Sequence, residues 1–328
     1  MDGLRFGRFG TVVSEAVVPP STTGGRTLEF RAEPRVTEDS NTFLAFYNPI
    51  ESRNFSIHQS EADLELRVAS SSAWRPASIS RLYIPDAFRV RKPSFWAIIA
   101  GPSGTSIFRD GGYVAKIPKA FISQKEFSGR VVIGTSPAFN DPWLGVVTGI
   151  AVYDRELTFR EIERHERTWI ASERPDLQPT DNCKMLYLFN ERGGSVVHNR
   201  VADRPDLDIP VNYSILNQTL LDPVWRAASW SRSFWTDMFI NIVGLIPFGF
   251  LYSSYFFGIG FHRPRLAASV FGVMISLFIE IVQSHLPTRD SSMSDVIGNA
   301  AGTFLGAWLY RGTAAQVVDQ ALNRLAHR

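Results

Sequence analysis

An apolar run at residues 238–260 constrains this chain more than any other feature of its sequence. Asn241 and two serines are its main polar interruptions. A helix needs about 20 predominantly apolar residues to cross a bilayer, and this run reaches that length. Two further apolar runs follow at residues 266–282 and 296–310. The C-terminal part of the chain is therefore predicted to be an α-helical transmembrane bundle with three spans.

Each predicted span carries two polar residues that stand three or four positions apart, a spacing that puts both on one helix face. Consecutive spans run antiparallel. Pairs at the start of the first span, the end of the second and the start of the third therefore reach the same side of the membrane. Ionisable groups inside a span are costly and indicate a functional site. We name the predicted set the polar layer: Asp237, Asn241, Glu280, Gln283, Asp295 and Asn299, with Arg289 of the second loop folded over it.

Small residues recur along the third span, with Gly298, Gly302 and Gly306 at four-residue intervals. Such a ridge allows helix backbones to approach closely, and we favour this packing role over a chemical one. Pro247 lies inside the first span and removes one backbone donor. It predicts a kink or a non-helical turn at that point.

The last quarter of the chain contains five short motifs. They are Asp237-x-x-x-Asn241, Ile246-Pro247-Phe248-Gly249, Ile279-Glu280-Ile281-Val282-Gln283, Leu286-Pro287-Thr288-Arg289, and Asp295-Val296-Ile297-Gly298-Asn299 followed by Gly302 and Gly306. In order and spacing this set resembles the VanZ-like family of small bacterial membrane proteins. The resemblance implies a membrane domain at residues 237–311. The family's namesake is associated with resistance to the glycopeptide teicoplanin, and other members occur beside envelope polysaccharide systems. Members commonly carry another helix before the first motif, and the adjacent sequence contains none.

The first half of the chain shows many short β-rich runs separated by turn residues. Residues 63–68 alternate polar and apolar side chains, as a half-buried antiparallel strand does. Asp110-Gly111-Gly112 is a hairpin signal between two such runs. Many strands without intervening helices favour a β-sandwich or barrel. The predicted strands are residues 27–30, 42–47, 55–58, 63–68, 95–100, 105–109, 113–117, 131–133 and 146–153.

A helix is predicted at residues 159–170, opened by Thr158 and Glu161 as a capping box. Together with residues 105–111 and 143–157 it resembles the last third of a laminin-G-like, concanavalin-A-type jelly roll. The resemblance implies an all-β jelly-roll sandwich, which we place at residues 1–222, with extra edge strands at residues 183–214. Domains of this kind bind sugars, proteins or metal, or only fill space. The residues expected to pack in the sandwich are Trp143, Phe159, Ile162, His165, Trp169 and Ile170.

Charges around the spans predict their orientation. The first loop contains His262, Arg263 and Arg265, and Arg311 opens the tail. The positive-inside rule places the first loop and the tail in the cytoplasm, and hence the sandwich and the polar layer outside. These assignments predict a multi-pass protein of the bacterial cytoplasmic (inner) membrane with an extracytoplasmic β-sandwich.

Two shorter segments complete the domain plan. Residues 223–236 form a linker whose tryptophans, Trp225, Trp230 and Trp235, suit the membrane interface. Residues 312–328 place apolar side chains at helical spacing, which predicts an amphipathic cytoplasmic tail on the membrane surface. Residues 1–10 lack the apolar core of a signal peptide, so we expect a targeting segment or a further helix upstream.

Composition and motifs argue against several classes of function. The net charge of +2 gives no reason to expect a nucleic-acid partner, and Cys183 is the single cysteine, which excludes an intramolecular disulfide. The sequence shows no nucleophile beside a base, no metal-spaced cluster of His or Cys and no phosphate loop. We expect no cofactor and no metal.

The polar residues also have simpler interpretations. Asp237 and Asp295 stand at predicted helix starts, where an N-cap satisfies free backbone donors. Glu280 has Arg289 as a structural partner. Under these interpretations the polar layer only locks the helices together.

Three functions stay open. The one we favour is a non-enzymatic, VanZ-like envelope protein: its external sandwich binds glycan or protein, and its membrane domain binds a lipid-linked headgroup or glycopeptide. Its partners are membrane lipid and a cell-envelope glycan or lipid-linked precursor. The alternative is a membrane enzyme that acts on such a glycan, with Glu280, Asp237 and Asp295 as acid and base. The third is a structural role. An enzyme should lose activity but still fold with Glu280→Gln, whereas a helix lock should lose folding.

Overall fold

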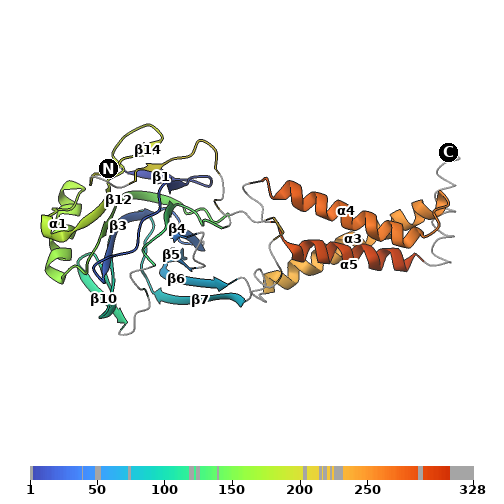
Figure 1. The fold of residues 1–328 in the computed structure, drawn as a ribbon, viewed down its shortest axis with the longest axis horizontal. Helices are drawn as coiled ribbons and strands as arrows, with labels where there is room; N and C mark the ends of the chain where they lie inside the picture. The colour runs from blue at the N-terminus through green and yellow to red at the C-terminus, as the bar shows by residue number, and fades with distance from the viewer. Residues whose placement is uncertain are drawn as a thin grey trace. The chain divides into compact units, whose positions relative to one another are not determined.

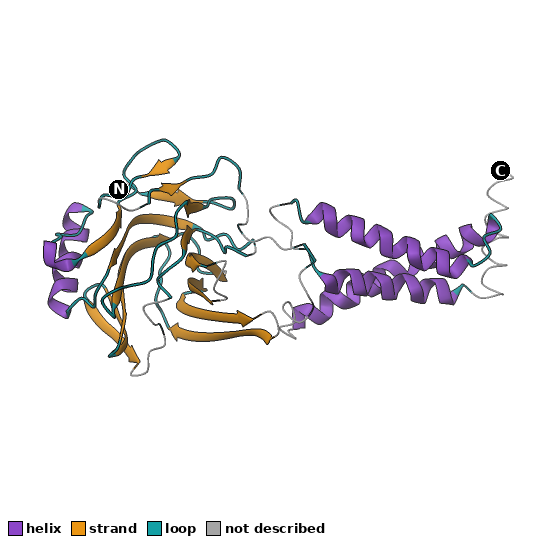
Figure 2. Cartoon of the chain, viewed as in Figure 1, coloured by secondary structure: helices purple, strands orange, loops and turns teal. Residues whose placement is uncertain are grey.

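The computed structural model describes residues 3–38, 40–48, 53–72, 75–117, 122, 126–138, 140–201, 205–213, 216, 220–221, 224, 232–286 and 291–310. The chain divides into two compact units, Met1–Asn217 and Gln218–Arg328. The described strands all belong to the first unit, and the three longest helices belong to the second (Figure 1, Figure 2). An all-β sandwich followed by a helical part is thus confirmed as the fold class.

The first unit contains two antiparallel sheets. Sheet A has seven described strands in the order β1, β12, β3, β8, β9, β10, and β13 also pairs with β12. Their bounds are β1 Leu4–Phe6, β3 Arg26–Pro34, β8 Ser94–Gly101, β9 Gly104–Arg109, β10 Gly112–Ile117, β12 Gly145–Tyr153 and β13 Cys183–Tyr187. Sheet B has eight described strands in the order β14, β15, β2, β11, β4, β5, β6, β7. Their bounds are β2 Val12–Ser14, β4 Ser40–Tyr47, β5 Arg53–Ser60, β6 Asp63–Ser72, β7 Arg75–Ile84, β11 Arg130–Ile133, β14 Val196–Val197 and β15 Leu207–Asp208.

The core lies between the two sheets, and strand alternation explains how they share it. In β6, Leu64 and Leu66 are fully buried in the core. Glu65 between them belongs to the opposite face, because successive side chains of a strand alternate. Phe30 of sheet A meets Phe43 of sheet B with ring centroids 4.9 Å apart. Each large apolar side chain that is fully buried stabilises the fold by about 1.5–3 kcal/mol, so the core stabilises the unit without a disulfide.

Helix α1 (Phe159–Ser172) covers the outer face of sheet A (Figure 1). Thr158 and Glu161 form the predicted capping box. Ile162 and Trp169 are buried against sheet A, as predicted. The prediction is wrong for Phe159 and Ile170, which are 50% and 56% exposed. At 3.6 residues per turn, both lie about a quarter turn from the centre of the buried face.

A buried polar network holds α1 on sheet A. His165 is 0% exposed. Its Nδ1 lies 2.9 Å from Glu29 Oε1, and its Nε2 lies 3.1 Å from Asp181 Oδ2 in the short helix η1 (Pro179–Asp181). Burial by itself would lower the pKa of His165, but the hydrogen bonds and charges of Glu29 and Asp181 raise it above its usual value. Both ring nitrogens face carboxylate oxygens, which only accept, so the ring bridges two carboxylates as a double donor and His165 is a packing residue as predicted.

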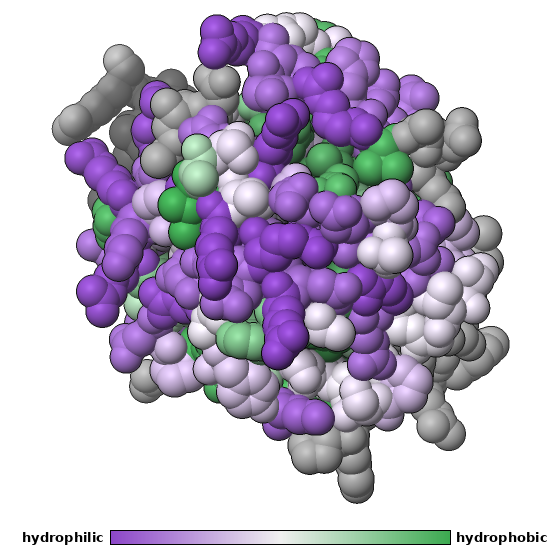
Figure 3. Space-filling model, turned by 90° about the vertical axis from the view of Figure 1, so that its left-hand side faces the viewer, coloured by the Kyte–Doolittle hydropathy of each residue, from purple (hydrophilic) through white to green (hydrophobic). Residues whose placement is uncertain are grey.

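The face of the first unit that carries α1 is mostly hydrophilic, with apolar side chains in small, separate patches (Figure 3). Trp143, the other residue expected to pack, is 1% exposed, and its Nε1 donates to Gln59 Oε1 at 2.7 Å. Neither observation indicates a sugar platform at His165 or Trp143.

The second unit consists of α3 (Arg232–Gly258), α4 (Pro264–Gln283) and α5 (Met293–Leu309). Two segments, Phe234–Gly258 and Pro264–Gln283, are long and apolar enough to cross a membrane. Helix α5 has 17 residues and falls short of the length a typical span needs. The structure thus supports two candidate spans where the sequence predicts three. Pro247 lies within α3 without ending it, so the predicted non-helical turn is wrong.

Some sequence predictions fall outside the described residues. Trp225, Trp230 and the amphipathic tail at residues 312–328 are among them. Trp235 is described and lies in the first turn of α3, where it is 54% exposed.

Candidate functional site

Helices α3 and α5 of the second unit pack through the predicted glycine ridge. A Cβ atom on Gly302 would lie 2.1 Å from the Ile242 carbonyl oxygen, and one on Gly306 would lie 2.0 Å from that of Ile246. The contacts advance in the same direction along both helices, so α3 and α5 run parallel. The backbones are close enough that only glycine fits, which is the packing role the spacing predicts.

Helix α4 runs antiparallel to α3 and α5. Near its start, Arg265 Nη2 donates to the Tyr310 carbonyl oxygen at 3.3 Å. Near its end, Glu280 reaches Ser292 at the start of α5. The start of α3, the end of α4 and the start of α5 therefore lie at one end of the unit, where the sequence places the polar layer.

Glu280 is the most deeply buried carboxylate of the polar layer, with 2% exposure. Its Oε2 accepts a hydrogen bond from the backbone N–H of Ser292 at 2.8 Å. The side chain of Ser291 is a second hydrogen-bond partner. Ser292 is the N-cap of α5, so the carboxylate lies at the positive end of that helix. Glu280 is thereby held in one position by backbone and side-chain donors.

Asp295 links α5 to α3. The Asn241 Nδ2 donates to Asp295 Oδ1 at 2.7 Å. Asp295 also interacts electrostatically with Glu280 on one side and Asp237 on the other. The structure therefore brings three carboxylates into one region.

Neither aspartate is a helix cap. Helix α3 begins at Arg232, so Asp237 lies inside it. Ser292, not Asp295, is the N-cap of α5, and its hydroxyl oxygen accepts from the Ser294 N–H. The simpler interpretation of both aspartates as N-caps is wrong.

The remaining members of the polar layer differ in their contacts. Asn299 is 9% exposed, and its Nδ2 donates to Ser276 Oγ at 2.9 Å. Its Oδ1 has no hydrogen-bond partner in the described part of the chain. Gln283 is half-buried at the last turn of α4. Arg289 lies outside the described residues, so its predicted place over the layer stays a prediction.

The polar layer offers mainly hydrogen-bond acceptors. Among the described residues, Glu280 accepts from Ser292, Asp295 accepts from Asn241, and the buried Asn299 oxygen has no partner. Within the described ranges, no group of three His, Cys, Asp or Glu side chains is placed to hold a metal ion. Such a layer suits a ligand that brings hydrogen-bond donors or positive charge.

Sequence reasoning missed the three serines that connect the layer, Ser276, Ser291 and Ser292. A local signal existed for Ser292, because a serine three residues before an acidic residue at a helix start resembles a capping box. Ser276 stands one helical turn before Glu280 and so shares its face. Ser291 had no signal, since its position depends on the loop.

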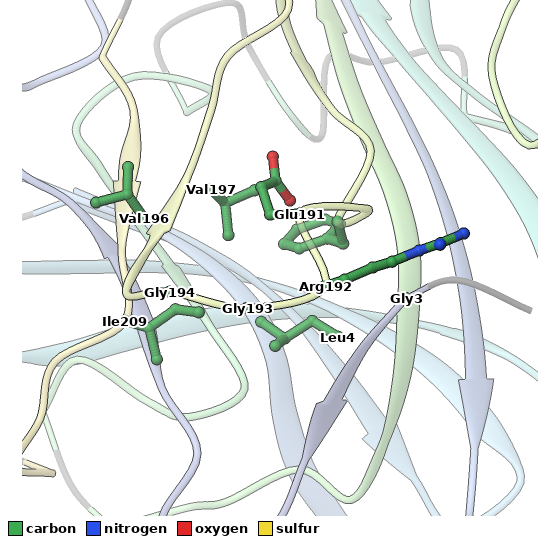
Figure 4. Close-up of a pocket in the computed structure, with 10 residues that line it drawn as sticks. Gly3, Leu4, Glu191, Arg192, Gly193, Gly194, Val196, Val197 and Ile209 are labelled. Atoms are coloured by element: carbon green, nitrogen blue, oxygen red, sulfur yellow. The ribbon is translucent and has the colours of Figure 1, made fainter.

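A separate cavity of about 350 Å³ lies in the first unit, beside β1 and β14 (Figure 4). Its walls are largely apolar, with Leu4, Val197 and Ile209 among them. In Figure 4 the Arg192 side chain extends away from Val197 and Ile209. The lining gives no reason to assign chemistry to this cavity.

The second unit is of the membrane-protein class, with apolar helices joined by a polar layer. The family model described as VanZ/LLP1 matches residues 185–316. Protein VanZ of Enterococcus faecium is 35% identical over 89 residues, which are 27% of this chain and 53% of that protein. The C-terminal part of this chain is a VanZ-like domain, and the resemblance seen in the motifs is confirmed. The chain spans about half the length of this relative. The family match begins at residue 185, within β13, whereas the sequence predicts that the membrane domain begins at residue 237.

Several solved structures are similar to this chain in fold. The heptameric SAP-like pentraxin of Limulus polyphemus is 13% identical, with 50% of this chain and 79% of that chain covered and a TM-score of 0.36. The Ruminococcus gnavus IT-sialidase CBM40 bound to α2,3 sialyllactose is 13% identical (50% and 95% covered, TM-score 0.36). Domains LG4-5 of the mouse laminin α1 chain are 8% identical (48% and 43% covered, TM-score 0.36). This likeness carries no inference about a ligand of this chain.

Proposed function

We propose that this chain is a multi-pass protein of the bacterial cytoplasmic membrane whose sandwich and polar layer face outward. The apolar length of α3 and α4 supports two crossings. Support for the third comes from the packing of α5 along α3, because Gly298, Gly302 and Gly306 follow α3 at one turn after another. With 17 residues at about 1.5 Å each, α5 is about 26 Å long, close to the hydrocarbon thickness of about 30 Å. Arg263 and Arg265 support a cytoplasmic loop between α3 and α4.

In this arrangement the polar layer binds the headgroup of a lipid-linked envelope precursor, and the sandwich binds an envelope glycan. The observation that carries the proposal is the buried Glu280, fixed at the N-terminus of α5 beside the Asp295–Asn241 pair. The acceptors are preorganised, and the exposed Asp237 marks the side open to solvent. A headgroup rich in hydroxyl or amine donors satisfies them. A glycopeptide of the teicoplanin type offers similar donors to the same layer.

Binding fits the geometry better than acid–base catalysis. Glu280 and Asp295 hold different partners, Ser292 in one case and Asn241 in the other. A general acid or base must lie within hydrogen-bond reach of the proton it transfers, and the Ser291 hydroxyl beside Glu280 is only 1% exposed, which keeps it from a substrate.

The test is to identify the lipid that accompanies the protein. The full chain is extracted in polymer-bounded native nanodiscs, and the lipids that co-purify are measured by mass spectrometry. We expect enrichment of a lipid with a sugar- or amine-bearing headgroup. Glu280→Gln should reduce that enrichment about tenfold, since a hydrogen bond to a charged group is worth about 1.5–3 kcal/mol. The glutamine oxygen still accepts from Ser292, so the fold is retained.

The matched control is Glu163→Gln on the exposed surface of α1. It should leave the lipid unchanged. Equal enrichment in the Glu280 and Glu163 variants, or no enriched lipid in the unaltered protein, would show that the polar layer is not a headgroup site.

A further inference from the structure

The outer face of sheet B carries a cavity that the function proposed above does not use. Its volume is about 120 Å³, and strands β4 to β7 form its floor. Ser56 and His58 of β5 line it, and they alternate with Phe55 and Ile57, which are buried in the core. The segment at residues 136–138 forms one wall. The cavity therefore opens away from the sandwich core.

A chain of hydrogen bonds fixes the polarity of the Ser56 hydroxyl. The Thr42 hydroxyl donates to Asp141 Oδ2 at 2.5 Å and lies 3.3 Å from His58 Nδ1. Because the Thr42 proton is used on Asp141, Thr42 accepts from a protonated Nδ1. His58 Nε2 is then the acceptor for Ser56, whose Oγ lies 2.9 Å away. The lone pairs of Ser56 are left as an acceptor toward the cavity.

Arg67 provides the cavity with a hydrogen-bond donor. Its side chain lines the cavity and is 22% exposed. Its Nη2 donates to Glu65 at 2.6 Å, which uses part of the five N–H donors that a guanidinium carries. The guanidinium thus keeps donor capacity beyond its bond to Glu65, and the cavity combines one donor group with one acceptor.

The charges around the cavity balance. Arg67 and Arg81 both pair with the fully buried Glu65, at 2.6 and 3.4 Å. Asp141 accepts from the N–H and the hydroxyl of Thr42 and supplies a second negative charge. Burial, followed by the positive charges of Arg67 and Arg81, lowers the pKa of His58 to about 3, so its ring is neutral. Two cations face two anions, and a neutral polar ligand fits better than a charged one.

The size and the lining of the cavity further limit the class of ligand that it can bind. The cavity holds about four water-sized groups at about 30 Å³ each. An acetamido group has that many non-hydrogen atoms. Ala45, Ala69 and Ile79 give the cavity an apolar side on which a methyl group can pack. A carbonyl oxygen matches Arg67, and an amide N–H matches Ser56.

We propose that this cavity binds the acetamido group of an N-acetylated sugar, with the carbonyl oxygen on Arg67, the N–H on Ser56 Oγ and the methyl against Ala45, Ala69 and Ile79. The assignment rests on the proposed glycan-binding role of the sandwich and names its site and ligand class. Ser56 and Arg67 are the specificity-determining residues.

The test compares two trisaccharides that differ in the acetamido group. Triacetylchitotriose and cellotriose are titrated against the detergent-solubilised full chain, and binding is followed by saturation-transfer NMR. We expect the acetamido methyl protons to receive the strongest saturation, and an affinity for triacetylchitotriose at least about tenfold above that for cellotriose. Ser56→Ala should lower the ratio of the two affinities by about tenfold. Ala69→Val fills the cavity without removing a polar group and should abolish the preference for triacetylchitotriose.

The control for the filled cavity is Ala115→Val on β10 of sheet A, which should bind as the unaltered chain does. Thermal unfolding followed by tryptophan fluorescence confirms that each variant is folded. Equal binding of both trimers overturns the acetamido assignment and leaves the glycan role in place. Binding of neither trimer overturns both, while the lipid measurement on Glu280→Gln reports separately on the membrane unit.

Discussion

Two buried polar clusters of this protein differ in how completely their side chains are paired. In the first unit, Glu29 receives hydrogen bonds from Tyr153 at 2.7 Å and Trp169 at 3.3 Å besides its contact with His165. In the second unit, Asn299 keeps an oxygen without a partner in the described ranges. An unsatisfied buried acceptor costs about 1–3 kcal/mol. The saturated network therefore serves stability, whereas the second unit keeps a buried acceptor unsatisfied at Asn299.

The first residue-scale prediction concerns pH. The folded-state pKa of His165 is raised above its unfolded value of about 6.5. Its protonated form therefore stabilises the fold. This contribution is fully present below about pH 6.5 and is lost as the pH rises through the raised pKa. The thermal midpoint of the first unit should fall over that window. Tryptophan fluorescence melts of the full chain between about pH 6 and 9 measure it.

His165→Gln should remove this pH dependence and lower stability by about 3 kcal/mol, because Glu29 and Asp181 lose the cation between them. His198→Gln is the matched control, since the His198 side chain is 59% exposed and pairs with Asp206 at the surface. An unchanged pH profile in the His165 variant would mean that the ring is neutral in the fold.

The sequence predicted the packing role of His165 but neither of its partners. Glu29 stands 136 positions away, and only the pairing of β3 with β12 brings it beneath α1. The pair of Ser56 and His58 is different. Two residues apart in a predicted strand, they necessarily share one face, so this part of the second cavity was open to prediction. The position of Asp141 could not be predicted, because this residue lies in a loop.

At the scale of elements, close helix contact makes the strongest demand on sequence. Gly302 lies where any Cβ meets the α3 backbone. Gly302→Ala should force α3 and α5 apart and cost about 1–3 kcal/mol, the usual penalty of overpacking. Thermal denaturation of the detergent-solubilised chain, read by size-exclusion chromatography, measures the loss.

Gly244→Ala is the matched control. It lies in α3, and a Cβ there meets no atom within 4 Å. Alanine is the better helix former by about 1 kcal/mol, so this variant should be unchanged or slightly more stable. Equal destabilisation by both substitutions would contradict the close approach of α3 and α5.

The sequence predicted long elements better than short ones. The apolar runs located α3, α4 and α5, and the alternating runs located the inner strands of both sheets. The sequence did not predict strands β1 and β2, because three residues are too few to show an alternating pattern. Strand β7 was not predicted because, among the described strands, it lies at the edge of sheet B and pairs with β6 alone, where packing constrains a sequence less. The acceptor set of the polar layer was predictable from helical spacing, and its serine donors were not.

At the scale of the whole molecule, the two units differ in where they place their apolar side chains. One buries an apolar core between sheets, and the other presents apolar side chains outward, with Phe239 at 65% and Phe278 at 65% exposure. A helical unit with such a surface needs a membrane around it. Which side of the membrane the sandwich occupies is then decided by the direction of one helix.

Helix α4 offers the direct test of that direction, because Arg263 and His285 flank it and both are exposed. Ser291 is a poor labelling site, since it is 1% exposed and accepts from the Leu221 N–H. In a Cys183→Ala background, His285→Cys should react with a membrane-impermeant maleimide added to intact cells. Arg263→Cys should react only after permeabilisation. The reverse pattern would place the sandwich in the cytoplasm, and labelling of both sites from one side would show that α4 does not cross.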